Sequence, residues 1–265
     1  MLRKIHIPTI ALISFWLSAC QSTLNEAEIL FKNQAYEEVV SKLDNYLFFN
    51  VTDLKALHLR ARAYEELDRI PEAIKDYERI IALDRDYAQA FAGIGKIYFN
   101  QKNYKDAELA LLNAANKDPE DYEILYLLGR TLLVNENYSL SEEFLMKARE
   151  INQKDAKLHF YLGMARAFRG DILGCAASFN TYVNFEPNNA VGRYNRGFAL
   201  MRAEYYEWAL EDFEAVLKQN PNHVEALAKK GICLKQLGDS QGCQFIQEAA
   251  SKGSDFAQSY LELCS

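Results

Sequence analysis

Few residues in this chain have the types and spacing that catalysis or metal binding requires. Gly93, Gly95 and Lys96 could begin a phosphate-binding loop, but the third glycine and the preceding strand of such a loop are missing. Close packing between helices explains these glycines better. The four histidines stand singly, without the spacing of metal ligands: His6, His58, His159 and His223. The sequence therefore predicts neither an enzyme nor a protein that holds a metal or cofactor.

One cysteine near the start has the setting for a chemical modification. Arg3 and Lys4 precede a mostly apolar run over residues 5–17, which is shorter than the ~20 residues that span a bilayer as a helix. A positive start, a short apolar centre and small residues at the end are typical of a secretory signal peptide. Leu17-Ser-Ala-Cys20 resembles the lipobox of bacterial lipoprotein precursors.

The lipobox resemblance implies that residues 1–19 are removed and that Cys20 carries lipid. An ordinary signal peptide with an incidental cysteine and an uncleaved anchor are the alternatives. Gln21 stands where an Asp would retain an enterobacterial lipoprotein at the inner membrane. We therefore expect a lipid-anchored protein of the bacterial cell envelope, at the outer membrane and facing the periplasm.

The charge of the chain argues against nucleic acid as a partner. Removal of residues 1–19 takes away two of the 30 Lys and Arg residues and none of the 37 Asp and Glu residues, which leaves a formal net charge of −9. An acidic chain without a basic cluster binds nucleic acid poorly. Because 49% of the residues are hydrophobic and only five are proline, the chain can bury a continuous core.

Small and large residues recur along the chain with a period of 34. Small residues occupy one column, Ala73, Ala107, Ser141, Cys175, Ala209 and Cys243, and twelve residues earlier another: Ala61, Gly95, Gly129, Gly163, Gly197 and Gly231. Larger residues follow the first column by four positions: Tyr77, Leu111, Leu145, Phe179 and Phe213. This pattern predicts two closely packed helices in each period.

The period and these columns resemble the tetratricopeptide repeat, a helix–turn–helix unit of 34 residues. The resemblance implies an all-α, right-handed solenoid without strands. Six units tile without insertion: 54–87, 88–121, 122–155, 156–189, 190–223 and 224–257. We expect a degenerate first unit over 20–53 and a capping helix over 258–265, since a solenoid needs a polar end.

Two side-chain pairings follow from the repeat register. Arg60 and Arg196 share one position, and Asp76 and Asp212 lie sixteen residues after them, so we expect each Arg to reach its Asp or an acid of a neighbouring repeat; solvated charges are the alternative. In an oxidising compartment we expect a Cys243–Cys264 disulfide between the last repeat and the cap. Cys233–Cys264 is the second choice and no bond the third, with Cys175 expected to be a free core thiol.

Tetratricopeptide repeats bind ligands on one face of their first helices. In repeats 122–155, 156–189 and 190–223 that face is unusually apolar, and such a patch typically marks an interaction site. We expect a groove for an apolar peptide or amphipathic helix, lined by Tyr126, Arg130, Leu133, Val134, Phe160, Met164, Phe168, Tyr194, Phe198, Met201 and Arg202. The Lys and Asn of a carboxylate clamp are missing. A tight superhelix, the chain's own tail or a second copy could instead cover the patch.

Two functional hypotheses follow. In the first, the protein is a membrane-anchored adaptor that holds a protein or peptide partner, similar in role to pilotins of pilus assembly or to scaffolds for cell-wall hydrolases. In the second, it is a structural or self-associating envelope lipoprotein without a discrete ligand. The sequence does not name the partner.

Overall fold

The structure is a computed structural model that describes residues 22–264, and every regular element among them is helical. The chain divides into two compact units, Met1–Ile124 and Leu125–Ser265, called unit 1 and unit 2 below. The all-α helix–turn–helix fold predicted from the sequence is confirmed. The lipobox and Cys20 lie outside the described residues.

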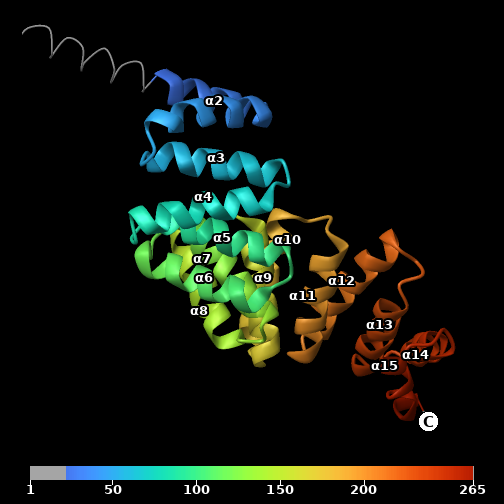
Figure 1. The fold of residues 1–265 in the computed structure, drawn as a ribbon. Helices are drawn as coiled ribbons and strands as arrows, with labels where there is room; N and C mark the ends of the chain where they lie inside the picture. Colours follow the sequence, from blue (N-terminus) through green and yellow to red (C-terminus); the bar gives the residue numbers. More distant parts are fainter. Residues whose placement is uncertain (1–21, 265) are drawn as a thin grey trace, which may run out of the picture. The chain divides into compact units, whose positions relative to one another are not determined.

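Unit 1 is built from three helix pairs (Figure 1). The first pair is the helical segment 22–32 with α2 (Tyr36–Phe49), the second is α3 (Leu54–Glu66) with α4 (Ile70–Leu83), and the third is α5 (Ala88–Asn100) with α6 (Tyr104–Lys117). Buried aliphatic side chains between them, including Leu43, Leu57 and Ile80, form one continuous core.

Unit 2 continues the same architecture from α7, which crosses the boundary between the units. Its helices are α7 (Tyr122–Val134), α8 (Tyr138–Ile151), α9 (Ala156–Arg169), α10 (Ile172–Phe185), α11 (Ala190–Arg202), α12 (Tyr206–Gln219), α13 (Val224–Gln236) and α14 (Gln241–Ser251). Each of the six predicted repeats from 54 to 257 thus holds a first and a second helix.

The small residues of the repeat are explained by close helix contacts. A Cβ added at Gly95 would lie 2.6 Å from the side chain of Leu111, and one at Gly129 would lie 2.6 Å from Leu145. Both contacts are far inside van der Waals distance. The larger side chain on the second helix therefore fills the space that the glycine on the first helix leaves open.

The turn between the two helices has the same backbone geometry in all seven repeats. Its central residue has positive φ at positions 34, 68, 102, 136, 170, 204 and 238, which are spaced by 34. Only Gly170 and Gly238 are glycines; the other five have φ between 57° and 66°. The degenerate first repeat shares this turn, and α2 begins and ends 34 residues before α4 does.

The end of the chain differs from the expected single capping helix over 258–265. The structure has a four-residue α15 (Asp255–Gln258) and a 3₁₀ helix η1 (Leu261–Cys264). Gly253, with φ of 91°, ends the preceding helix, and the Ser254 hydroxyl caps the next by accepting from the Ala257 N–H at 3.0 Å. The cap therefore begins earlier than predicted and consists of two short helices in place of one.

The expected Arg–Asp pairings are confirmed in both units. In unit 1 the Arg60 guanidinium donates to both Asp76 oxygens at 2.7 Å, and it also reaches Asp44 of the preceding repeat at 2.6 Å. In unit 2 Arg196 donates to both Asp212 oxygens at 2.7 Å. Burial opposes the charge of Arg60, but the hydrogen bonds to Asp76 and Asp44 outweigh it and raise the pKa of Arg60. Each Arg thus joins the two helices of its repeat.

Candidate functional site

The exposed apolar side chains of unit 2 gather on one side of its helix stack. We call the side that carries the turns within repeats the hairpin edge, and the side where one repeat passes into the next the junction edge. Six of the ten large hydrophobic residues exposed in unit 2 belong to the hairpin edge: Val134, Phe168, Leu173, Tyr205, Trp208 and Leu237. The hairpin edge of unit 2 thus carries exposed apolar side chains from four successive repeats.

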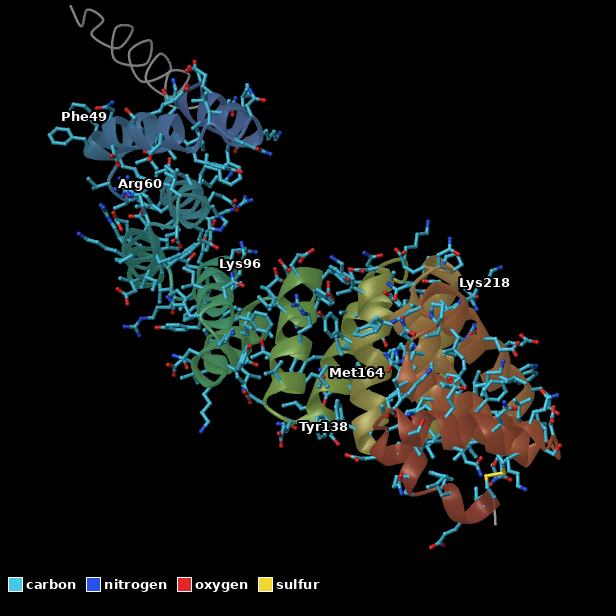
Figure 2. All side chains as sticks on the ribbon, turned by 90° about the vertical axis from the view of Figure 1, so that its right-hand side faces the viewer. Phe49, Arg60, Lys96, Tyr138, Met164 and Lys218 are labelled. Atoms are coloured by element: carbon cyan, nitrogen blue, oxygen red, sulfur yellow. A yellow bond between two sulfur atoms is a disulfide. The ribbon has the colours of Figure 1, made fainter. Side chains whose placement is uncertain are left out.

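Aromatic pairs organise this hairpin edge. Phe168, at the end of α9, stacks on Tyr138 at the start of α8, with ring centroids 4.8 Å apart and planes 14° apart. Tyr205 stacks on Trp208 at the start of α12, with centroids 5.3 Å apart. Figure 2 shows Tyr138 at the end of its helix, while Met164 lies midway along α9. The two stacks leave Phe168 56% and Trp208 58% exposed.

A cleft opens beside Trp208, between helices of two successive repeats. It has a volume of about 470 Å³ and is lined by Ala176, Ala177 and Asn180 of α10, Arg196 and Leu200 of α11, and Trp208 and Glu211 of α12. The two alanines leave the space that the indole borders. Arg196 is held in place by Asp212 and by the Asn180 side-chain oxygen at 2.9 Å. The cleft offers an apolar wall with polar groups at its margin.

The predicted groove is only partly open. Tyr126 and Met201 are buried, at 8% and 7% exposure, so the prediction that they line a surface is wrong. Arg130, Leu133, Phe160, Met164, Tyr194 and Phe198 are half-buried, and only Val134, Phe168 and Arg202 are exposed. All three exposed residues stand at the last turns of first helices. The open part of the predicted face thus lies next to the hairpin edge.

Neighbouring repeats account for the burial of the other groove residues. The Tyr126 ring meets Tyr161 of the next first helix with centroids 5.9 Å apart, and the Arg130 guanidinium lies 4.8 Å from the Tyr161 centroid. Phe160 packs edge-on against Phe179 and Tyr182 of its own repeat. These aromatic residues build the core between helices and are not displayed to a ligand.

The C-terminal tail covers the far end of the predicted face. Phe256 of α15 lies 6.4 Å from Phe198, and the Lys229 ammonium lies 3.9 Å from the Phe256 ring centroid. Lys229 is 4% exposed and is paired with Glu225 at 2.8 Å. Burial works against the Glu225 carboxylate, but the hydrogen bonds from Lys229 and Ser254 lower the pKa of Glu225. The chain itself therefore occupies this part of the face.

The corresponding face of unit 1 is polar. The Tyr77 hydroxyl donates to Glu65 at 2.6 Å, and the Lys96 ammonium lies 3.0 Å from the other Glu65 oxygen. His58 lies beside the rings of Tyr77 and Tyr87. Burial, aided by the nearby charge of Arg62, lowers the pKa of His58 to about 4. This face offers charged groups that are already paired with one another.

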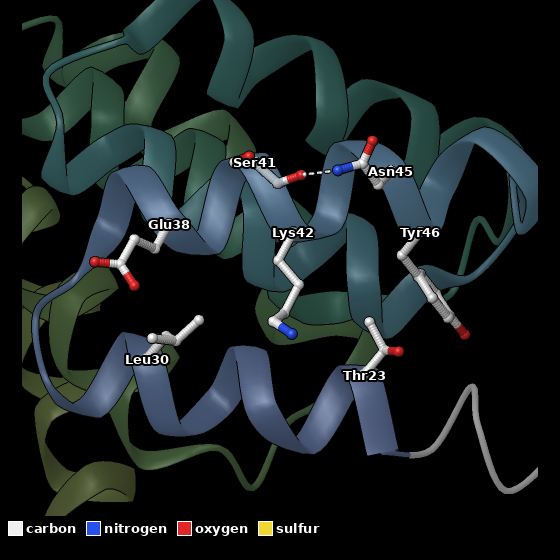
Figure 3. Close-up of a pocket in the computed structure, with 7 residues that line it drawn as sticks. All are labelled: Thr23, Leu30, Glu38, Ser41, Lys42, Asn45 and Tyr46. Atoms are coloured by element: carbon white, nitrogen blue, oxygen red, sulfur yellow. Dashed lines mark hydrogen bonds between the residues drawn. The ribbon is translucent and has the colours of Figure 1, made fainter.

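A second hollow lies within the first helix pair of unit 1 (Figure 3). It has a volume of about 590 Å³ and is lined by Thr23, Leu30, Glu38, Ser41, Lys42, Asn45 and Tyr46. Lys42 points from α2 toward the 22–32 segment and pairs there with Glu26. Most of its lining is polar, so it resembles a hydrated surface groove more than a peptide site.

The four cysteines within residues 22–264 form one disulfide and two buried free thiols. Cys243 and Cys264, the favoured pair, are joined by a disulfide with Cα atoms 5.4 Å apart. Cys175 and Cys233 are free and buried. Burial raises the pKa of Cys175 to about 11 and that of Cys233 to about 12, so both are protonated thiols at neutral pH. No cluster of His, Cys, Asp and Glu within residues 22–264 could hold a metal ion.

Family models place the repeats among known sequences. Two models, both described as tetratricopeptide repeat, match residues 58–118 and 190–223. Among solved structures, the chain is similar to YrrB, described as a TPR protein with an unusual peptide-binding site: identity is 26%, the TM-score is 0.66, and 71% of this chain and 97% of that chain are covered. The chain is a tetratricopeptide-repeat protein.

The chain is also similar to one further solved structure and to segments of two curated proteins. PilF of Pseudomonas aeruginosa matches with 16% identity and a TM-score of 0.65 over 79% of this chain and 95% of that chain, which shows the fold alone. Hsp70-Hsp90 organizing protein 3 of Arabidopsis thaliana is 33% identical over 36% of this chain and 17% of its own length. BBSome complex member BBS4 of Bos taurus is 25% identical over 77% and 42%. The chain spans less than half of either curated relative.

Proposed function

We propose that this protein is a lipid-anchored adaptor of the bacterial cell envelope that holds a peptide segment of a partner protein on the hairpin edge of unit 2. The anchor is Cys20, at the outer membrane and facing the periplasm. The observation that carries the proposal is that Trp208, in one of the two exposed aromatic stacks of the hairpin edge, also borders the cleft between two repeats. Within residues 22–264 no helix is long and apolar enough to cross a membrane.

The chemistry of the edge selects the kind of ligand. An apolar side chain of the partner would enter the cleft between Leu200 and Trp208, where it would exchange water for aliphatic and indole surface. Arg196 is paired with Asp212 and donates to Asn180, so its guanidinium is already engaged within the protein. Asn180 and Glu211 at the margin can accept hydrogen bonds from the partner's backbone. Aromatic residues with a few polar groups are typical of interface centres.

The likeness to YrrB supports a peptide as the ligand, since that protein is described as having a peptide-binding site. The chaperone-organizing relative in Arabidopsis supports an adaptor role. The second hypothesis, a self-associating envelope protein without a discrete ligand, uses the same apolar edge. The two hypotheses differ in what covers Phe168 and Trp208: a different protein, or a second copy of the chain.

Two matched variants test the binding surface. Phe168→Ser removes an exposed aromatic from the hairpin edge, and Phe185→Ser removes one from the junction edge; both side chains stack on one neighbour and are 56% and 45% exposed. Affinity capture from envelope extract, read by mass spectrometry, should lose a partner with Phe168→Ser and retain it with Phe185→Ser. Equal capture by both variants would contradict the proposed surface.

The anchor and the alternative need their own measurements. Cys20→Ala should move the protein from the outer-membrane fraction to the soluble periplasmic fraction, and mass spectrometry of the wild-type protein should find lipid on Cys20. Sedimentation equilibrium of the wild-type and Phe168→Ser proteins separates the hypotheses. A dimer that Phe168→Ser dissociates would favour self-association over partner binding.

A further inference from the structure

In unit 1 most of the exposed large hydrophobic residues lie at the junction edge, whereas in unit 2 most lie at the hairpin edge. Four of the six large hydrophobic residues exposed in unit 1 belong to its junction edge: Phe48, Phe49, Val51 and Leu83. Phe48 and Phe49 end α2 and are the most exposed large hydrophobic residues described, at 76% and 73%. Their rings meet edge to face with centroids 4.9 Å apart, and Figure 2 shows Phe49 pointing away from the helices.

The start of the described chain lies at the same edge. Residues 22–32 run antiparallel to α2, and Thr23 lines the same hollow as Asn45 and Tyr46, one turn before the phenylalanine pair. Figure 3 shows Thr23 and Tyr46 at the same end of the two helices. Cys20 is two residues before Ser22, and two residues span at most about 7 Å. A lipid on Cys20 would therefore hold this edge close to a bilayer surface.

Two exposed basic side chains lie near the phenylalanine pair. Lys55 and Arg79 are exposed there, and Arg79 donates to the Val51 carbonyl. Asp53 accepts from the Tyr46 hydroxyl at 2.7 Å and from the backbone N–H groups of α3. Its carboxylate is thus engaged within the protein, while Lys55 and Arg79 are exposed.

We infer that the junction edge of unit 1 is a membrane-contact surface, in which Phe48, Phe49 and Val51 enter the lipid headgroup region while Lys55 and Arg79 meet anionic headgroups. The inference rests on the proposed lipid at Cys20. Aromatic rings favour the membrane–water interface because their apolar faces leave water there. A second contact beside a lipid chain strengthens attachment and fixes orientation, which a flexible tether alone does not. Unit 1 then contacts the bilayer along its junction edge.

The test uses tryptophan as a depth probe in the full-length, exported protein. Of the two tryptophans, Trp16 leaves with the signal peptide and Trp208 is replaced by Phe. Into this background we place Phe49→Trp or, as a matched control, Leu109→Trp; Leu109 is 64% exposed on α6, away from the edge. Each protein is reconstituted into phosphatidylethanolamine–phosphatidylglycerol vesicles with brominated acyl chains. Circular dichroism checks the helicity, and mass spectrometry the modification of Cys20.

We expect the Phe49→Trp emission to shift to the blue and to be quenched by the brominated lipid, and the Leu109→Trp emission to do neither. Equal quenching of the two reporters in vesicle-bound, lipidated protein would overturn the inference and leave the anchor intact. A blue shift that grows with protein concentration in detergent without vesicles would show that a second copy covers the edge, which also overturns it. An unmodified Cys20 would overturn the anchor and this inference together.

Discussion

Units 1 and 2 are built from the same repeat but expose apolar side chains on opposite edges. In unit 1 they cluster at the junction edge around Phe48 and Phe49, and in unit 2 at the hairpin edge around Phe168 and Trp208. The packing between first and second helices is alike, because the small column faces a larger side chain in both units. The repeat thus fixes the core and leaves both edges free to vary. The two edges can therefore differ in the kind of molecule that they contact.

The face of the first helices on which the groove was predicted also differs between the two units. In unit 1 the face carries His58, Glu65 and Lys96, which are paired or partly buried. In unit 2 aromatic side chains occupy it, and the tail closes its far end through Phe256 and Lys229. A polar face can stay in water, whereas an aromatic face must be covered. Neighbouring helices cover most of it, and the tail covers its far end, so the expected groove is narrower than its sequence suggests.

The largest expected effect tests whether the shared Arg–Asp pair is equally important in both units. Asp212 is fully buried and pairs with both Arg196 and Arg193, whereas Arg60 retains Asp44 if Asp76 is lost. Removing one partner of a buried pair costs about 3–5 kcal/mol. We expect Asp212→Ala to lower the free energy of unfolding by about 4 kcal/mol and Asp76→Ala by about 3 kcal/mol. Hydrogen exchange reads each unit separately; a larger loss in unit 1 would contradict this order.

The next largest expected loss of stability comes from breaking the disulfide, and it is confined to the end of unit 2. The Cys243–Cys264 bond closes a loop with a sequence separation of 21, so Cys264→Ser should cost about 3 kcal/mol. Amide protection should fall in α14 and α15 and remain unchanged in unit 1. Reductant should produce the same loss in the wild-type protein and no further loss in the variant. Unchanged protection after reduction would mean that the Lys229 and Phe256 contacts alone hold the tail.

Acid should weaken unit 1 through His58. The folded pKa of about 4 lies below the unfolded value of about 6.5, so folding favours the neutral ring. The stabilisation is fully present above about pH 6.5 and is lost as the pH falls toward 4. Between pH 7 and 5 the free energy of unfolding of unit 1 should drop by about 2 kcal/mol.

His58→Gln is the control for this acid effect, since glutamine does not titrate. Hydrogen exchange in unit 1, measured at both pH values with unit 2 as an internal reference, should lose its pH dependence in the variant. A variant that retains the full acid effect would assign the effect to another group.

The sequence predicts the repeat well because its period repeats many times. Each small column is sampled six times, so the Gly95–Leu111 type of contact follows from register, and the Arg–Asp pair follows from its recurrence in two repeats. The left-handed turn residue escapes prediction, because only Gly170 and Gly238 carry the glycine that usually signals it. Asp68 and Glu204 adopt the same φ because the two helices impose it.

The surface is predicted less well because it depends on neighbouring repeats. A helical wheel places Tyr126 and Met201 outward, but it does not include Tyr161 or the helices packed around α11, which bury them. Glu225 and Lys229 pair four residues apart on α13, and Phe256 of the distant tail covers the lysine. The Trp208 cleft joins helices of two repeats, so only Ala176 and Ala177 hint at it.

The smallest expected effect is the one that best separates the two edges from the core. Substitution of an exposed residue usually changes stability by less than about 0.5 kcal/mol. Phe49→Ser in unit 1 and Phe168→Ser in unit 2 should therefore leave the free energy of unfolding within about 0.5 kcal/mol of wild type. Urea denaturation followed by circular dichroism measures this.

If both proteins keep their stability, their functional losses can be assigned to contacts with other molecules. Phe49→Ser should weaken vesicle contact and retain partner capture, and Phe168→Ser should do the reverse. A loss of several kcal/mol in either variant would instead place that ring in the fold. That outcome would contradict the proposal that the two edges bind different molecules, because the exposed ring would then be accounted for by its contribution to stability.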